Sequence, residues 1–160
     1  MTNLLKYLVR RMALAKNGSK VSQRMLPLES VKSAAVFIDS GLPGADAAES
    51  AVRKFFSARN IGLLLLRPDS AQLNYAGFMR RRFRIPAGTG RGEDLFISLS
   101  DDPGNFASEF EARCSPARFK VGRVRLTGEI FDLCVGLPEG GQADQAAVFE
   151  TISEYLLKIK

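Results

Sequence analysis

The chain has 160 residues, a length that fits one domain and allows a core large enough to fold without a metal or a disulfide scaffold. It contains no histidine and two cysteines, which excludes a Ser-His-Asp triad, a Cys-His pair and a histidine-ligated zinc site. We predict no catalytic residues, no metal and no cofactor, although carboxylates, lysine, tyrosine and cysteine leave some enzyme chemistry open.

The net charge of +6 is concentrated near the N-terminus. Residues 1–30 carry six cations and one anion, whereas residues 31–160 carry 17 cations and 16 anions. This distribution predicts a basic N-terminal arm over residues 1–30 and a nearly neutral single α/β domain over residues 31–160. Within the arm, apolar residues recur at the spacing of one helix side: Leu4, Leu5, Leu8, Val9, Met12 and Ala15.

The arm is expected to form a short amphipathic helix, with Lys6 and Arg10 opposite its apolar side. In the simplest interpretation, the apolar side docks on the domain and the cations stay in water. In a second interpretation, Lys6, Arg10 and Arg11 contact nucleic acid or a ribonucleoprotein, because a basic arm releases counterions from phosphate backbones. Adhesion to a membrane surface is the least favoured interpretation, because the helix is short and the chain has no tryptophan.

No apolar run approaches the roughly 20 residues that a membrane-spanning helix needs. The longest such run covers residues 61–66. A secretion signal is not expected, because Lys6, Arg10 and Arg11 interrupt the apolar residues near the N-terminus. We therefore predict a cytoplasmic protein without a membrane segment.

The first part of the domain has the pattern of a strand, a helix and a second strand. Residues 34–39 form a short apolar run that is typical of a buried strand. Asp46 and Glu49 resemble a capping box at the start of a helix that ends near residue 60. Residues 61–66 are apolar on both faces, which predicts a central parallel strand.

The following segment carries a second basic cluster. Residues 78–85 are predicted to form a strand in which arginine and aromatic side chains are interleaved. Such a surface can stack the bases of single-stranded nucleic acid, whereas the competing interpretation is an exposed edge strand protected by its charges. The candidate partner-binding residues in this segment are Arg80, Arg81, Arg82 and Arg84.

Further strands and helices alternate toward the C-terminus. Residues 94–100 predict a third core strand, and residues 106–113 predict a short helix. Apolar residues at helical spacing predict a closing helix over residues 142–160. This alternation predicts a three-layer α/β/α sandwich, with a mainly parallel sheet and one antiparallel hairpin.

The hairpin is expected from two apolar segments separated by a short turn sequence. They cover residues 119–126 and 130–137. Asp132 lies within the second segment and is expected to pair across the hairpin with Arg123 or Arg125.

Three segments resemble those of a known family. Residues 94–97 read DLFI, residues 131–135 read FDLCV, and residues 117–122 between them read ARFKVG. This layout is similar to that of a family of small proteins of unknown function from Bacteroidetes bacteria, with two "FDLLI"-like strands around an "AxF[K/R]VG" segment. The resemblance covers most of the chain from about residue 30 onward and implies a bacterial protein. It carries over no functional residue, because the family has no assigned activity.

Polar residues follow several of the predicted strands. In open α/β sheets, ligands bind beyond the carboxyl ends of the strands, and helix N-termini at that edge favour anions. The candidate ligand-binding residues are Asp39, Ser40, Gly41, Gly44, Asp69, Asp101 and Asp102. The competing interpretation gives these residues turn and capping roles, and neither the dinucleotide glycine spacing nor a Walker lysine is present.

Two functional hypotheses result. The leading one is a non-enzymatic interaction module whose basic arm docks on an acidic partner, such as RNA, a ribonucleoprotein or a protein. The alternative is an enzyme or sensor that binds a phosphorylated small molecule or a nucleotide at the carboxyl ends of the strands.

Overall fold

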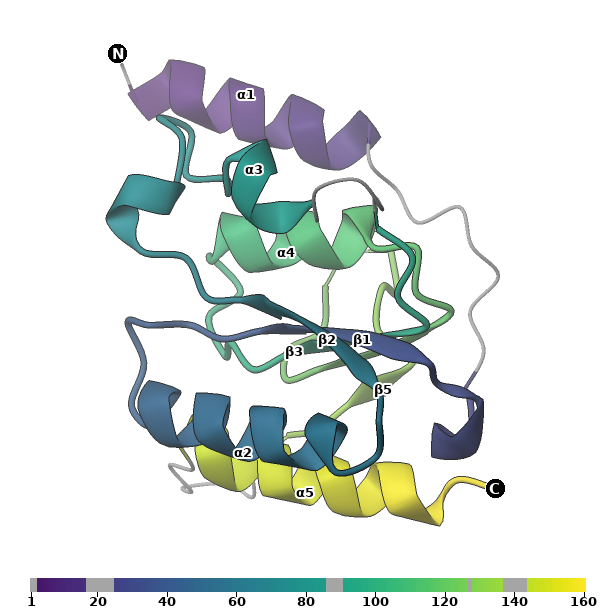
Figure 1. Ribbon diagram of the computed structural model, residues 1–160. Coiled ribbons are helices and arrows are strands. Elements are labelled where there is room, and N and C mark those ends of the chain that lie inside the picture. The colour runs from purple at the N-terminus through teal and green to yellow at the C-terminus, as the bar shows by residue number, and fades with distance from the viewer. Residues whose placement is uncertain (1–2, 17–24, 86–90, 127, 137–143) are drawn as a thin grey trace.

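The computed structural model describes residues 3–16, 25–85, 91–126, 128–136 and 144–160. These residues contain a sheet of five parallel strands in the order β2-β1-β3-β4-β5. The strands are β1 (Ser33–Phe37), β2 (Gly62–Leu66), β3 (Leu95–Ser98), β4 (Phe119–Gly122) and β5 (Leu133–Cys134). The α/β class expected from the sequence is confirmed (Figure 1).

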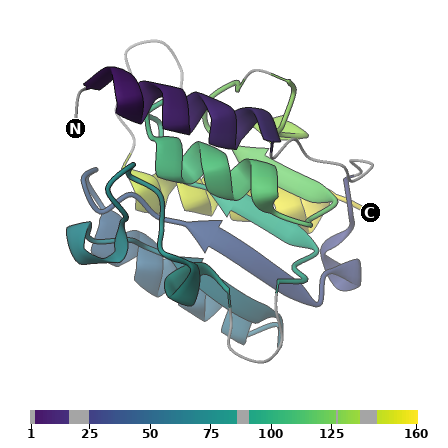
Figure 2. The ribbon, with the colours of Figure 1, turned by 90° about the horizontal axis from the view of Figure 1, so that it is seen from above.

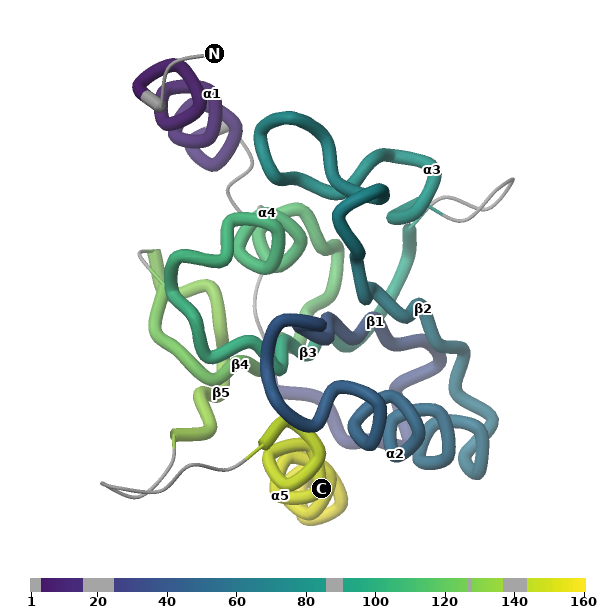
Figure 3. Tube along the Cα trace, turned by 90° about the vertical axis from the view of Figure 1, so that its left-hand side faces the viewer, coloured from purple at the N-terminus to yellow at the C-terminus, as the bar shows by residue number. Residues whose placement is uncertain are grey.

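Helices cover both faces of the sheet, as the three-layer prediction requires (Figures 1 and 3). On one face, α2 (Ala45–Ser57) lies beside α5 (Gln145–Lys158). On the other face lies α4 (Phe106–Cys114), with the single turn α3 (Arg81–Arg84) near it. The N-terminal helix α1 (Asn3–Lys16) packs outside α4, and two 3-10 turns are formed by η1 (Leu28–Ser30) and η2 (Ser70–Gln72).

Each face of the sheet packs its own apolar core. Successive side chains of a strand point to opposite faces, so β1 and β3 are apolar at almost every position. Phe37 and Phe96 are fully buried on the α4 face. On the other face, the rings of Phe56 and Phe149 join the core between α2 and α5, and Phe55 meets both edge-on at centroid distances of 5.1 and 5.6 Å.

The strand β2 lies at the edge of the sheet, so the prediction of a central strand for residues 61–66 is wrong. Apolar residues on both faces of a strand show that both faces are covered, but they do not show how many strands pair with it. Here α2 packs on one face of β2 and α3 on the other. The leucines at positions 63–65 are therefore half-buried although, among the described strands, β2 pairs with β1 alone.

Residues 78–85 do not form the predicted strand. The side-chain oxygen of Asn74 accepts hydrogen bonds from the backbone N–H groups of Ala76 and Phe78 at 2.9 and 3.1 Å. This tight turn lets Met79 form an isolated antiparallel bridge with Leu73. The chain then turns into α3, so the arginines of this segment project from a helical turn and not from a strand.

The predicted antiparallel hairpin is replaced by a parallel pair. In β4 and β5, Val121 pairs with Leu133 and Gly122 with Cys134 in parallel register. The loop between them leads the chain back, so that β5 runs in the same direction as β4. The ring of Phe131 lies directly on Gly122, where a β-carbon would come within 2.6 Å of the tip of the ring. Asp132 pairs with neither predicted arginine; its carboxylate accepts the backbone N–H of Lys120 at 2.8 Å.

The helix α1 is present as expected, but it docks on the opposite side from the one that the simplest interpretation requires. Its apolar residues Leu4, Leu8 and Met12 are exposed to 67%, 45% and 59%, whereas Val9 and Arg10 are half-buried. Arg10 provides the reason: its Nε donates to the carbonyl of Ala76 at 2.5 Å, and its guanidinium lies 4.5 Å from the centre of the Phe106 ring. Within the described ranges, no helix has the length and hydropathy to cross a bilayer.

Candidate functional site

A crevice is expected at the carboxyl edge of the sheet, where the loops after β1 and β3 diverge. The helix that follows β1 is α2, which covers one face, and the helix that follows β3 is α4, which covers the other. Because β1 and β3 are neighbours, their two loops part directly above the sheet. Ligands of open α/β sheets bind at such a point.

Asp39 lies at the centre of this edge and is held from several directions. Its carboxylate accepts hydrogen bonds from the backbone N–H of Gly41 at 2.9 Å, the amide of Asn105 at 2.9 Å and the hydroxyl of Ser100 at 3.2 Å. Its backbone N–H and carbonyl are both bonded by the side-chain amide of the buried Gln145, at 2.9 and 2.7 Å. Asp39 therefore ties the loops after β1 and β3 to each other and to α5.

A hollow of about 260 Å³ opens beside Asp39. Ser40, Gly41 and Asn105 line it together with Asp39, and Arg10 reaches it from α1. The hollow thus combines one carboxylate, one guanidinium and small polar groups. The structure brings together three of the candidate ligand-binding residues here: Asp39, Ser40 and Gly41.

The other four candidates lie outside the hollow. Asp69 caps η2 by accepting the N–H groups of residues 71 and 72. Asp102 accepts the N–H of residue 104 at 2.8 Å, and a carboxylate oxygen of Asp101 lies 3.6 Å from the guanidinium of Arg123. Gly44 is the N-cap of α2 with a φ of 78°, and a β-carbon there would come within 2.7 Å of Asp144 on the neighbouring α5. Gly44, Asp69 and Asp102 thus have the turn or capping roles of the competing interpretation, whereas Asp101 pairs with Arg123.

Asp46 and Glu49 do not form the predicted capping box, since the N-cap of α2 is Gly44 and not Asp46. Both carboxylates instead pair with Arg67, at 2.7 and 2.8 Å, and Arg67 also donates to the hydroxyl of Ser40 at 3.1 Å. The hydrogen bond from Arg67 lowers the pKa of Glu49, against the opposing effect of burial. Arg67 therefore links the end of β2 to the start of α2.

The candidate partner-binding residues separate into held and exposed cations. Arg10 is anchored beneath α1, Lys6 is half-buried, and Arg84 donates to the buried carboxylate of Glu111 at 2.5 Å. The remaining four are exposed and, in the part of the chain that the structure describes, none pairs with a carboxylate: Arg11, Arg80, Arg81 and Arg82.

These exposed cations come from α1 and from the segment that ends in α3, which lie on the same side of the molecule. Both stand over the face that α4 covers, and both are open to view from that side (Figure 2). Two exposed tyrosines accompany them. We define the α1–α3 surface as these six residues: Tyr7, Arg11, Tyr75, Arg80, Arg81 and Arg82.

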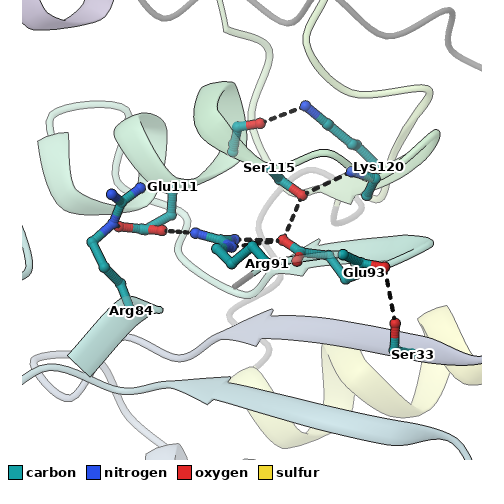
Figure 4. Close-up of polar contacts among 10 residues, drawn as sticks. Ser33, Arg84, Arg91, Glu93, Glu111, Ser115 and Lys120 are labelled. Atoms are coloured by element: carbon teal, nitrogen blue, oxygen red, sulfur yellow. Dashed lines mark hydrogen bonds and ion pairs between the residues drawn. The ribbon is translucent and has the colours of Figure 1, made fainter. Parts of the chain in front are cut away.

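A buried ionic cluster between α4 and the sheet was not expected from the sequence (Figure 4). The carboxylate of Glu111 is fully buried and pairs with Arg84 and Arg91. Arg91 also pairs with Glu93 at 2.6 Å, and Glu93 accepts the hydroxyl of Ser115 at 2.8 Å. The cluster therefore fixes the segment before β3 and the end of α3 to the inner face of α4.

Lys120 lies next to this cluster and is completely buried in β4 (Figure 4). Its ammonium group donates to the carbonyl of Ala112 at 2.7 Å. Burial lowers the pKa of Lys120 to about 8, although the carboxylates of Glu93 and Asp132 oppose that effect. Burial also raises the pKa of the nearby Cys114 thiol, which keeps that thiol protonated near neutral pH.

The sequence gives only a faint signal for this cluster. Glu93 directly precedes an apolar run, and Glu111 lies on the side of α4 that carries buried alanines. Lys120 alternates with apolar neighbours, a pattern that normally places a lysine in water. Its face of β4 is covered by α4, which periodicity alone does not reveal. In the described segments, no three His, Cys, Asp or Glu side chains gather as they would around a metal ion.

The chain was compared with family models, with curated proteins and with solved structures, and none of them matches. The resemblance to the Bacteroidetes family therefore stays a prediction.

Proposed function

We propose that the protein is a binding module that docks on a polyanionic partner through the α1–α3 surface. The observation that carries the proposal is the exposure of Arg11, Arg80, Arg81 and Arg82 without a carboxylate partner in the described chain. Two basic segments that are far apart in the sequence contribute to one side of the molecule (Figure 2). Clustered cations of this kind bind polyanions by releasing condensed counterions.

The proposal is supported by a difference between two groups of arginines: some form ion pairs with carboxylates inside the domain, and others make only local contacts in the part of the chain that the structure describes. Arg84 and Arg91 pair with the buried carboxylate of Glu111, and Arg67 pairs with two carboxylates at the start of α2. The arginines at 80–82 make local contacts: Arg80 donates to the carbonyl of Leu73 at 3.2 Å, and the guanidinium of Arg82 lies 4.6 Å from the Phe83 ring centre. Their charges remain available to a partner.

Retention on immobilised heparin tests this proposal. The variant Arg80→Gln/Arg81→Gln/Arg82→Gln should elute at lower salt than the wild type, and its salt slope in solution binding should fall by about three, because each lost phosphate-like contact lowers the slope by about one. The matched variant Lys54→Gln/Lys158→Gln/Lys160→Gln removes the same charge from exposed positions on or just beyond α2 and α5. Equal weakening by both variants would contradict a localised binding surface.

We propose as a second candidate function the binding of a small phosphorylated ligand in the hollow beside Asp39. The support is the convergence of Arg10, Asp39, Ser40 and Asn105 on one space at the point where the β1 and β3 loops diverge. A thermal-shift screen with nucleotides and sugar phosphates tests it. A ligand at a hundredfold its dissociation constant should add about 2.7 kcal/mol to the free energy of unfolding. A stabilising ligand whose effect survives Arg10→Gln would place its site elsewhere.

A further inference from the structure

The outer side of α1 is apolar and lies uncovered beside the exposed arginines. We propose that the polyanionic partner of the α1–α3 surface is an anionic phospholipid bilayer, on which α1 lies flat with its apolar side in the headgroup region. This inference rests on the proposed function and names its partner. A helix that carries apolar residues on one side and cations around them is the form that binds such interfaces.

The first support is the way in which α1 is attached to the domain. The helix is held from beneath by Arg10, which bonds to the carbonyl of Ala76 and stacks on Phe106 of α4. This attachment turns the opposite side of the helix outward. That side carries four large aliphatic or thioether side chains with exposures of 45–67%: Leu4, Leu5, Leu8 and Met12.

The second support is the charge around this apolar side. The α1 helix, from residue 3 to residue 16, contains no acidic residue. Arg11 is exposed on the helix itself, and the arginines at 80–82 are exposed on the segment that ends in α3, which lies on the same side of the molecule as α1 (Figure 2). Tyr7 is 53% exposed and Tyr75 is 62% exposed. Tyrosine has an apolar ring and a polar tip, and such side chains favour the boundary between headgroups and acyl chains.

Charge and chemistry favour a bilayer over two other occupants. A second copy of the chain would bring Arg11 and the arginines at 80–82 of both copies toward one another, and like charges oppose that contact. A single-stranded nucleic acid would gain from the arginines and tyrosines but not from the aliphatic side chains of α1, since bases stack on rings and guanidinium planes. An anionic bilayer satisfies both the aliphatic and the cationic groups.

In the proposed complex, α1 lies in the headgroup region parallel to the membrane surface, and no segment needs to cross the bilayer. The helix has 14 residues. At a rise of about 1.5 Å per residue, such a helix is about 21 Å long, which is shorter than the roughly 30 Å hydrocarbon core. Because Arg10 fixes the inner side of α1 to the domain, only the outer side of the helix can face the bilayer. The domain behind the helix would then stay in the aqueous phase.

Sedimentation with lipid vesicles tests the inference on the full chain. The wild type should bind vesicles that contain phosphatidylglycerol and should not bind pure phosphatidylcholine vesicles. Leu4→Gln/Met12→Gln should lower the partition coefficient about a hundredfold, since about tenfold is lost for each large apolar side chain kept out of the interface. Both residues are exposed, so circular dichroism and thermal unfolding should be unchanged. Tyr155→Gln/Leu157→Gln, which removes two exposed apolar side chains from α5, is the matched control and should bind like the wild type.

Heparin binding by the same variants separates the two proposals. Leu4→Gln/Met12→Gln should keep heparin binding, whereas Arg80→Gln/Arg81→Gln/Arg82→Gln should weaken binding to both heparin and vesicles. Retention on heparin with no binding to anionic vesicles would overturn the bilayer and leave the proposed function standing. Tight binding to single-stranded RNA without vesicle binding, or a dimer in solution that Leu4→Gln/Met12→Gln dissociates, would also overturn it. A wild type that binds neither heparin nor vesicles at low salt would overturn the proposed function itself.

Discussion

Replacing Glu111 with glutamine is expected to lower the free energy of unfolding by about 3–5 kcal/mol, the cost of leaving buried charges without their partner. Glu111 is fully buried and pairs with Arg84 and Arg91, which are themselves mostly buried. In glutamine one of the two accepting oxygens is replaced by an NH2 group, which cannot accept from a guanidinium, and the neutral amide compensates neither charge. Glu93 then remains the only carboxylate paired with Arg91 among the described residues. Urea unfolding followed by circular dichroism measures the change in free energy.

Glu150→Gln provides the control for this substitution. Glu150 is exposed on α5, and in the described segments it has no ion pair. Its replacement is expected to change the free energy of unfolding by no more than about 0.5 kcal/mol. If Glu111→Gln were as mild as Glu150→Gln, the cluster of Figure 4 would not be an energetically coupled, water-excluded unit.

The stability of the protein is expected to rise with pH above neutrality because of Lys120. Its pKa is lowered to about 8 in the folded chain by burial, against about 10.4 for an unfolded lysine. Below pH 8 the lysine is protonated in both states, and the cost of burying the charge is at its largest. Between these two pKa values the unfolded state binds more protons, so the free energy of unfolding increases by up to about 1.4 kcal/mol per pH unit, for a total of about 3 kcal/mol.

Lys120→Met isolates this contribution from other groups that titrate in the same range, such as the two cysteines. Methionine fills much of the same space without an ionisable group. The difference in free energy of unfolding between wild type and variant should therefore shift in favour of the wild type as the pH rises from about 7 to about 10. A difference that stays constant over this range would mean that Lys120 keeps an ordinary pKa in the folded protein.

The buried parts of the sheet could be predicted from the sequence because their apolar runs have a single structural solution. The predicted strand at residues 34–39 overlaps β1, residues 94–100 contain β3, and the predicted closing helix contains α5. The position of β2 and the direction of β5 could not be predicted in this way. Pairing depends on which chain segments meet in three dimensions, and the apolar pattern of a strand does not encode its neighbour.

The candidate sites could likewise be predicted only in part, because some of their residues meet through contacts between segments far apart in the chain. Because parallel strands end at the same edge, the expectation that ligands bind beyond the carboxyl ends of the strands correctly placed Asp39, Ser40 and Gly41 together; all three line one hollow. This expectation could not find Arg10 or Asn105, since neither lies at the end of a strand. The amphipathic pattern of α1 was visible, but its orientation was not. The cation–π contact between Arg10 and Phe106 selects the docked side, and that contact joins segments far apart in the chain.

The edge position of β2 also bears on solubility. The outer side of this strand has no partner strand within the described chain, and its residues are almost all leucine, the kind of segment on which another chain can add a strand. The strand is five residues long, begins at Gly62 and is followed at once by Arg67 and Pro68. A glycine weakens strand pairing, a proline offers no backbone N–H, and a charge resists stacking of like chains. Gly62 and the two residues after the strand are therefore expected to limit strand addition at this edge, and replacing Arg67 or Pro68 should lower solubility as well as stability.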